Sequence, residues 1–281
     1  MSSTSPVHRA NPVHRVNGRA ADALRPVHLE LSALKFAEGS ALIEIGDTRV
    51  LAAVSVERRV PPFVEPGRGW LTAEYAMLPR ATHTRSAREV SRGRPASRSV
   101  EIQRLIGRSL RAAVDMAALP DLTLLIDCDV LQADGGTRTA AITAAYAALV
   151  QALGRLYLTG DVASWPVIRQ VAAISVGIVE DVPLLDLEYC EDQEAAVDMN
   201  IVGAAGGHLI EVQGTGEGRS FDRHELDLLV DLGQKGIGEL VEVQNRALAS
   251  VLEEVEAIRD RSRRRPAPAR DEKGLWGPPT G

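Results

Sequence analysis

The chain has 281 residues, of which 45% are hydrophobic and 25% are charged, with a net charge of −6 and two cysteines. This composition is that of an ordinary globular protein, and it excludes a disordered chain or a small disulfide-stabilised one. No run of eighteen apolar residues occurs, so we expect no segment that spans a membrane. Cys128 and Cys190 fall in strand-like runs and not in a Cys-x-x-Cys pair, so we expect two buried free thiols in a reducing compartment.

Both ends of the chain are predicted to be disordered. Residues 1–24 repeat the tetrapeptide Pro-Val-His-Arg and show neither apolar periodicity nor the hydrophobic stretch of a secretory signal. Residues 262–281 are basic and rich in proline, which is typical of a flexible tail. These limits leave residues 25–261 as the ordered domain.

The first predicted element is a β-hairpin over residues 40–55, with its turn at Gly46-Asp47. A basic segment follows. Residues 80–111 contain nine arginines and two acidic residues, a net charge of +7 that leaves −13 for the rest of the chain. Because arginine binds phosphate through a planar pair of donors, this segment favours a phosphate-rich partner over a merely solvated surface. Apolar spacing predicts a helix that begins near Val100.

Residues 122–131 are predicted to form a strand, and 139–156 an alanine-rich helix. Between them lies Asp134-Gly135-Gly136-Thr137-Arg138, in which two glycines, a hydroxyl and a guanidinium precede a helix N-terminus. Backbone N–H groups and the helix dipole favour an anion at such a place. The segment lacks the Gly-Lys-Ser/Thr of a P-loop. We therefore expect a phosphate site at Gly136, Thr137 and Arg138, with Arg98, at the start of the preceding helix, as a second source of charge.

The second half of the chain repeats this order of strands and helices. Strands are predicted over 171–179, 184–189, 197–202 and 208–213, and a helical region over 222–261 that breaks near Gly233, Gly236 and Gly238. The whole is predicted to be an α+β domain made of two similar halves.

Two aspartates of the second half are candidates for chemistry. Asp192 lies in a polar connection that is solvated surface in most proteins, but Asp198 opens a strand-like run, where an idle charge is unfavourable. Carboxylates with this spacing either hold Mg²⁺ near substrate phosphates or leave one carboxyl protonated as a general acid.

Four long motifs, taken in order, resemble the bacterial ribonuclease PH family. The resemblance runs from about Arg25 to about Ala249, and its motifs are residues 69–85, 101–112, 127–139 and 211–215. It implies the ribonuclease PH fold, which is like domain 2 of ribosomal protein S5. It also implies a phosphorolytic 3′→5′ exoribonuclease that trims precursor tRNA, and other structured RNAs such as rRNA, with inorganic phosphate, in a reversible reaction that releases nucleoside 5′-diphosphates.

The family's functional residues fall on specific positions of this chain. The resemblance implies a cytoplasmic homohexamer, a trimer of dimers, that uses phosphate as co-substrate and Mg²⁺ as cofactor. A ring subunit of the same fold that binds RNA without cleaving it is the alternative, but such subunits lack some of these residues. The implied residues are Asp192 and Asp198 for catalysis and for Mg²⁺; Arg98, Gly136, Thr137 and Arg138 for phosphate; and Arg80, Arg85 and Arg88 for tRNA.

Overall fold

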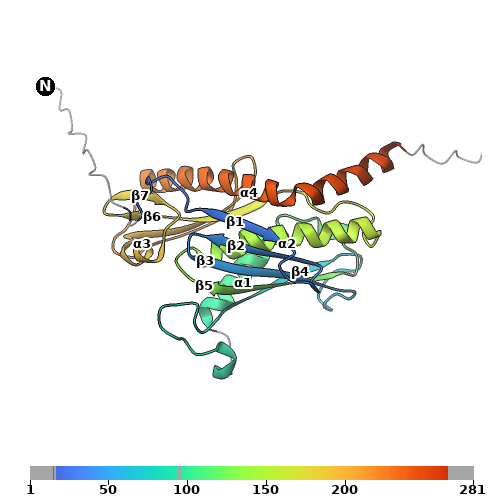
Figure 1. Ribbon diagram of the computed structural model, residues 1–281, viewed down its shortest axis with the longest axis horizontal. Coiled ribbons are helices and arrows are strands. Elements are labelled where there is room, and N and C mark those ends of the chain that lie inside the picture. The colour runs from blue at the N-terminus through green and yellow to red at the C-terminus, as the bar shows by residue number, and fades with distance from the viewer. Residues whose placement is uncertain (1–14, 16, 94–95, 265–281) are drawn as a thin grey trace, which may run out of the picture.

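The computed structural model describes residues 15, 17–93 and 96–264, and these form two β-sheets with helices packed between and against them (Figure 1). The first sheet has the strand order β1-β2-β3-β5-β4. Its pairs are antiparallel except β4 and β5, which are parallel and are joined through helix α1. The bounds are β1 Val27–Leu31, β2 Gly39–Ile45, β3 Thr48–Glu57, β4 Trp70–Met77, α1 Ser97–Arg111 and β5 Thr123–Gln132, with short 3₁₀ turns at Glu89–Arg92 and Met116–Ala118.

The second sheet has the order β7-β6-β8-β9 and is antiparallel throughout. Each half thus has its own β-sheet and a long helix, as expected. The parallel strand pair β4–β5 occurs in the first half alone. The bounds are β6 Val171–Val179, β7 Val182–Leu185, α3 Tyr189–Glu194, β8 Val197–Ala204, β9 His208–Gly216 and α4 Arg223–Arg264.

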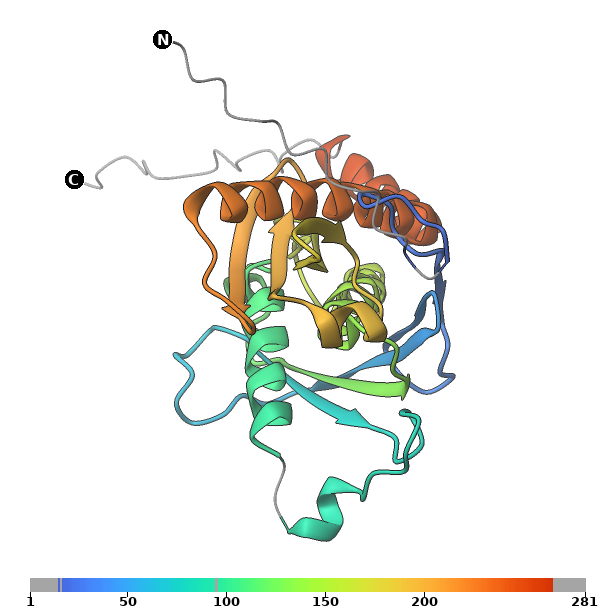
Figure 2. The same ribbon diagram turned by 90° about the vertical axis from the view of Figure 1, so that its left-hand side faces the viewer.

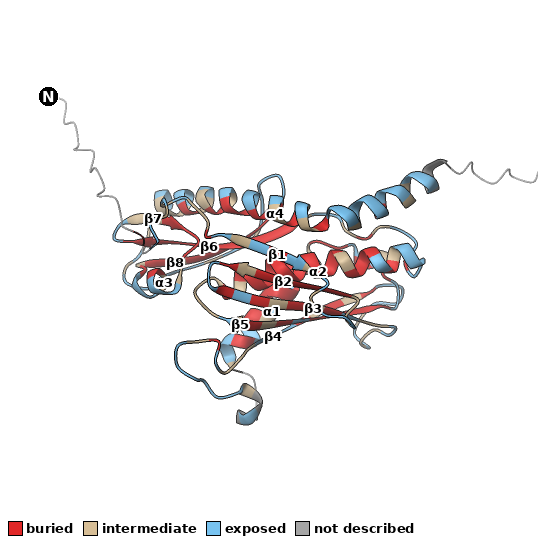
Figure 3. Cartoon of the chain, in the orientation of Figure 1, coloured by how far each residue is buried: buried red, intermediate tan, exposed pale blue. Residues whose placement is uncertain are grey.

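Helix α2, Thr137–Thr159, is the centre of the core. It packs against β2 and β3 of the first sheet, against β6 of the second and against α4, and most of its residues are buried (Figure 3). Among the described helices α2 alone is long and apolar enough to cross a membrane by length and composition, but 78% of its most apolar stretch is buried inside the protein. Such burial is the property of a core helix, because its apolar side chains already contact both sheets.

The predicted break in the last helix is wrong, since α4 runs without interruption from Arg223 to Arg264. Two of its glycines permit close packing and do not end the helix. A Cβ at Gly233 would lie 2.4 Å from Ile201 Cδ1, and one at Gly236 would lie 2.7 Å from Leu185 Cδ1. Each glycine destabilises the helix by roughly 1 kcal/mol relative to alanine, but it allows close packing of α4 on the second sheet, which offsets that loss. Its last turns rise away from the rest of the protein (Figure 1).

The predicted N-terminal boundary is also wrong in part. Arg15 and residues 17–24 are ordered against the second sheet, although 1–14 and 16 lie outside the described residues. Arg15 is buried in an ion pair with Glu191, and Asp22 pairs with Lys235 of α4. Because these contacts are made by charged side chains, apolar periodicity gives no sign of the ordered segment. At the other end, residues 262–264 belong to α4, and 265–281 lie outside the described part.

Several smaller expectations also change. The strand predicted over 184–189 ends at Leu185, because Asp186 takes a left-handed backbone conformation with φ of 57°. Helix α3 follows, and its start is closed by a capping box. Cys190 consequently lies on α3 and is exposed, while Cys128 is buried as expected. Strands β1 and β4 were not predicted, although Leu71, Ala73 and Tyr75 alternate with more exposed residues along β4.

Candidate active site

A cavity of about 480 Å³ opens where the two halves of the protein meet. It is lined from both sides, by the start of α1 and the start of α2 in the first half and by α3 and β8 in the second. The structure brings together in this cavity all six residues that the sequence marked for phosphate binding and catalysis. They are Arg98, Gly136, Thr137, Arg138, Asp192 and Asp198.

The turn before α2 adopts a conformation that requires its glycines. Gly135 and Gly136 have φ of 76° and 65°, and a Cβ on Gly135 would lie 2.3 Å from the Leu187 carbonyl oxygen. Helix α2 then begins with Thr137 and Arg138, earlier than the predicted Thr139. The first N–H groups of a helix have no acceptor within it, and they carry the positive end of its dipole. The turn therefore presents N–H groups, a hydroxyl and a guanidinium at the cavity.

Arg98 approaches the cavity from the first turn of α1, which begins at Ser97 and not near Val100. The carboxylate of Glu89 holds this end of the helix, because it accepts hydrogen bonds from the Ala96 N–H at 3.1 Å and from the Ser99 hydroxyl at 2.5 Å. Glu89 thus caps α1 in place of the N-cap residue, whose alanine side chain has no acceptor. No local sequence pattern indicates this role, because Glu89 lies seven residues before Ala96.

The two aspartates face the arginines across the cavity. Asp192 lies on α3, where burial raises the pKa of its carboxyl while Arg98 and Arg138 act in the opposite direction. Asp198, on β8, has its pKa raised to about 6, first by burial and then by the nearby charge of Asp192. Two half-buried carboxyls in mutual repulsion retain a proton more readily than free ones. The cavity thus has two arginines and a helix N-terminus in its wall, together with two carboxyls whose pKa values are raised.

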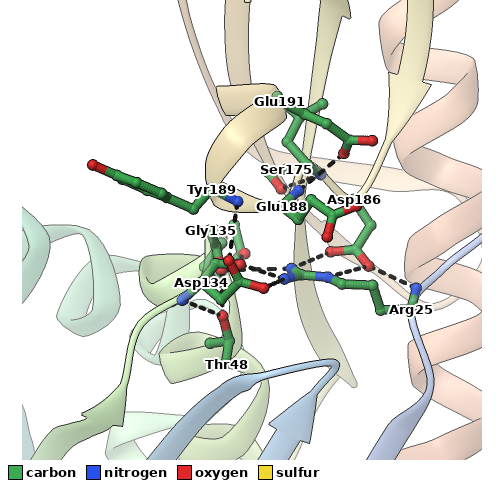
Figure 4. A network of polar contacts seen from close by, with 12 residues as sticks. Arg25, Thr48, Asp134, Gly135, Ser175, Asp186, Glu188, Tyr189 and Glu191 are labelled. Carbon is green, nitrogen blue, oxygen red and sulfur yellow. Dashed lines mark hydrogen bonds and ion pairs between the residues drawn. The ribbon is translucent and has the colours of Figure 1, made fainter. Parts of the chain in front are cut away.

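Behind the glycine turn lies a polar network that the sequence did not reveal (Figure 4). The Arg25 guanidinium donates to both carboxylate oxygens of Asp186, at 2.7 and 3.0 Å, and to the Asp134 carbonyl oxygen. The Thr48 hydroxyl donates to the Gly135 carbonyl oxygen at 2.7 Å. Arg25, Thr48 and Asp186 do not line the cavity, so these contacts hold the turn from outside it and orient its N–H groups before any ligand arrives.

The arginines expected to bind RNA do not line this cavity themselves, although neighbours of theirs such as Thr84, Ser86 and Ala87 do. Arg80, Arg85 and Arg88 are exposed on the segment between β4 and α1, which projects from the body of the protein (Figure 2). The rest of the basic segment is not all free for a ligand. Arg108 pairs with Glu211 at 2.6 Å, and Arg111 donates to the Leu71 carbonyl oxygen at 2.9 Å. These two arginines are therefore structural, which corrects the interpretation of the whole segment as one anion-binding strip.

Comparison with known proteins agrees with this geometry. Residues 23–153 match the model of the 3′ exoribonuclease family, domain 1, and residues 169–236 match domain 2 of the same family. The chain is 53% identical over 242 residues to a protein named ribonuclease PH from Moorella thermoacetica, covering 86% of this chain and 97% of that protein.

Solved structures give the same result for the fold. A chain of the Archaeoglobus fulgidus exosome with RNA bound to the active site has a TM-score of 0.71 and 26% identity, covering 81% of this chain and 91% of that chain. Rice Rrp46, from Oryza sativa, has a TM-score of 0.68 and 23% identity, covering 83% of this chain and all of that one.

Proposed function

The chain belongs to the ribonuclease PH group of the 3′ exoribonuclease family, and on that premise we propose that it trims tRNA precursors from their 3′ end. The enzyme is a phosphate-dependent 3′→5′ exoribonuclease, so inorganic phosphate is a substrate. The observation that carries the proposal is the single cavity in which two arginines and a helix N-terminus face two half-buried aspartates.

We assign the phosphate-binding role to Arg98, Thr137, Arg138 and the backbone at Gly136. In this arrangement the bound phosphate is the nucleophile, and one of its oxygens attacks the phosphorus of the terminal phosphodiester. The bond from that phosphorus to the 3′-oxygen of the preceding nucleotide breaks, and the terminal nucleotide leaves as a 5′-diphosphate. Holding two anions together and neutralising their charge are the main catalytic tasks in phosphoryl transfer.

The departing 3′-oxygen needs a proton, and we assign its supply to Asp192 and Asp198 acting as a unit. The raised pKa of Asp198, about 6, leaves a fraction of the pair protonated near neutral pH. Because the two carboxyls repel each other, the proton belongs to the pair and not to either residue alone.

As the alternative to holding a proton, the same two groups fit Mg²⁺ when both are ionised, because Mg²⁺ prefers a few protein oxygens together with substrate phosphates and water. No cluster of three or more histidine, cysteine or acidic residues is found in the described part of the chain, so the protein would contribute Asp192 and Asp198 and no further side chain of these types. When bound, the ion would neutralise charge on the phosphate oxygens.

We propose that Arg80, Arg85 and Arg88 bind the tRNA backbone outside the cavity. Their segment projects from the protein and is exposed, so it can reach phosphates upstream of the 3′ end.

We also propose a cytoplasmic homohexamer, a trimer of dimers. In support, the relative with RNA bound is part of an exosome, and β4 and β9 are edge strands of the described sheets, as β1 and β7 are. Light scattering would then give a mass six times the 30.2 kDa of one chain.

One experiment tests the proposal directly. The protein is incubated with a 3′-extended tRNA precursor, with and without inorganic phosphate, and the released nucleotides are separated by chromatography. We expect nucleoside diphosphates only when phosphate is present, and an unextended tRNA as the matched control should lose far fewer nucleotides. Monophosphates released without phosphate would indicate hydrolysis, and RNA binding without release would indicate the non-catalytic ring subunit.

A further inference from the structure

Helix α3, which carries Asp192, is too short to fix its own orientation. It has six residues, Tyr189–Glu194, and isolated helices of this length are unstable in water. Its first turn is closed by a capping box, in which the Glu191 carboxylate accepts the Glu188 N–H at 3.0 Å. The position of the Asp192 carboxylate in the cavity therefore depends on what holds α3 from outside.

The strongest external contact comes from Arg15, near the N-terminus. Its Nε and one terminal nitrogen each donate to a different oxygen of Glu191, both at 2.7 Å. Its remaining N–H groups donate to carbonyl oxygens of Asp186, Ala20 and Ala23 at 2.9 to 3.4 Å. The Arg15 side chain has no exposed surface, and every nitrogen of its guanidinium has an acceptor. Two parallel hydrogen bonds from one guanidinium fix both the distance and the orientation of the Glu191 carboxylate relative to Arg15.

The same N-terminal segment also holds the other wall of the cavity. Ten residues after Arg15, the Arg25 guanidinium joins Asp186 to the carbonyl oxygen of Asp134, next to the glycine turn (Figure 4). Arg15 holds α3 on one side and binds the Asp186 carbonyl on the other. A continuous chain of hydrogen bonds thus links the helix that bears Asp192 to the turn that binds phosphate.

Stability alone gives no reason for this buried pair. The desolvation of two charges offsets most of their attraction, and buried ion pairs are often replaced by apolar residues without loss of stability. Both carboxylate oxygens of Glu191 accept a hydrogen bond from Arg15 at 2.7 Å, and one of them also accepts the Glu188 N–H at 3.0 Å. The ion pair of Arg15 and Glu191, in which every guanidinium nitrogen has an acceptor, instead favours one position of α3 over others.

We propose that Arg15 is a positioning residue for the reaction: through Glu191 it sets the place of the Asp192 carboxylate relative to the phosphate bound at the start of α2. The proposal rests on the proposed function, and it makes the N-terminal segment a working part of the active site. Arg15 touches none of the residues assigned to phosphate, so its removal should slow turnover and leave phosphate binding intact.

The test compares three full-length variants with the wild type in the phosphate-dependent release assay. Arg15→Ala removes the fork. Arg15→Met combined with Glu191→Gln removes both charges, and the new amide keeps an oxygen for the Glu188 N–H. This variant therefore has no buried Glu191 carboxylate left with only the more distant Arg19, at 3.6 Å, as its ion-pair partner. Lys235→Ala is the matched control, because it releases the N-terminal segment from α4 at Asp22 without touching α3.

We expect both Arg15 variants to lose about tenfold or more in kcat, with KM for phosphate within about twofold of wild type, because small displacements of a catalytic group have effects of this size. Millimolar guanidinium chloride should restore part of the kcat of Arg15→Ala, while equal sodium chloride should not. Lys235→Ala should keep the wild-type kcat.

Unchanged kcat in the folded Arg15 variants would overturn the proposal, as would an equal loss in Lys235→Ala. A rise in KM for phosphate without a fall in kcat would also overturn it. These outcomes are separate from failure of the proposed function, which would appear in the wild type as an absence of phosphate-dependent diphosphate release.

Discussion

The hydroxyl group of Tyr75 donates a hydrogen bond to the Thr137 side-chain oxygen at 2.9 Å, inside the protein. Burial raises the pKa of Tyr75, so the tyrosine keeps its proton and remains the donor. The Thr137 oxygen is thus occupied as an acceptor, and its own hydrogen is free to point into the cavity. Strand β4 in this way orients a hydroxyl at the N-terminus of α2.

We therefore predict that Tyr75→Phe weakens phosphate binding. The ring is retained and packing is conserved, but the Thr137 hydroxyl loses the partner that orients it. A net hydrogen bond of about 1 kcal/mol corresponds to an increase of roughly fivefold in KM for phosphate. Steady-state kinetics with phosphate as the varied substrate measures it, and Tyr146→Phe, a change in the buried core away from the cavity, serves as control. A KM unchanged from wild type would contradict the assigned orientation.

Arg138→Ala should abolish most of the turnover while tRNA binding is largely retained. Arg138 lines the cavity and its side chain is mostly buried, with Glu101 as its ion-pair partner at 4.0 Å, a distance that leaves its donors free for phosphate. Loss of one charged donor to a transferring phosphate costs about 10²–10³-fold in kcat. Single-turnover release and filter binding of the same tRNA separate the two effects. Weakened tRNA binding with normal turnover would reverse the assignment.

The position of the glycine turn in the wall of the cavity was predictable because its signal is local. Gly135, Gly136, Thr137 and Arg138 are consecutive, and a glycine pair before an apolar helix specifies both backbone shape and ligand chemistry. The aspartates were identified less directly, since Asp192 looked like surface. Its half-buried position depends on α3, whose capping box is formed by Glu188 and Glu191, three residues apart in the sequence.

The supporting network was not predictable, because its contacts join residues far apart in the chain. Arg15 and Glu191 are separated by 176 residues, and Arg25 and Asp186 by 161. A single arginine in a polar leader carries no pattern that identifies a buried partner. Likewise, the glycines of α4 predict a break by propensity, and only the packing of Gly233 on Ile201 shows that they permit contact.

Gly135→Ala should destabilise the protein by about 2 kcal/mol more than Gly160→Ala. Both glycines have nearly the same backbone conformation, with φ of 76° and 79°, so each alanine bears a strain of about 1–2 kcal/mol. The two positions differ in the room available for a methyl group. A Cβ at Gly135 would lie 2.3 Å from the Leu187 carbonyl oxygen, whereas a Cβ at Gly160 would have no neighbour within 4 Å. Urea unfolding of both variants checks the difference, and equal losses would show that the turn relaxes freely.

Arg85→Ala should weaken tRNA binding and make it less dependent on salt, with the KM for phosphate unchanged. Arg85 is exposed on the projecting segment and lies outside the cavity lining. Loss of one phosphate contact reduces the slope of log affinity against log salt by about 1. Binding measured from about 50 to 300 mM potassium chloride tests it. Arg223→Ala is the control, because Arg223 pairs with Asp227 on α4; an equal change in slope there would indicate a general charge effect.

Asp198→Asn should make the protein more stable and less active near pH 7.5. The pKa of Asp198 is raised from 3.8 to about 6 in the folded protein, so the folded state binds the proton more tightly than the unfolded chain does. The contribution of this group to stability therefore falls as pH rises from about 4 to 6, and above about pH 6 the folded protein bears the full cost of a buried carboxylate. Asparagine bears no such charge.

The expected gain is about 1–3 kcal/mol near pH 7.5, vanishing below about pH 4, where both states of the wild type are protonated. Thermal unfolding of wild type and variant is measured from about pH 4 to 8 with EDTA present, so that no bound metal compensates the charge. Asp47→Asn, in an exposed turn, is the control and should show no such divergence. A variant less stable than wild type near pH 7.5 would mean that the Asp198 charge is favoured by Arg98 and Arg138 more strongly than burial disfavours it.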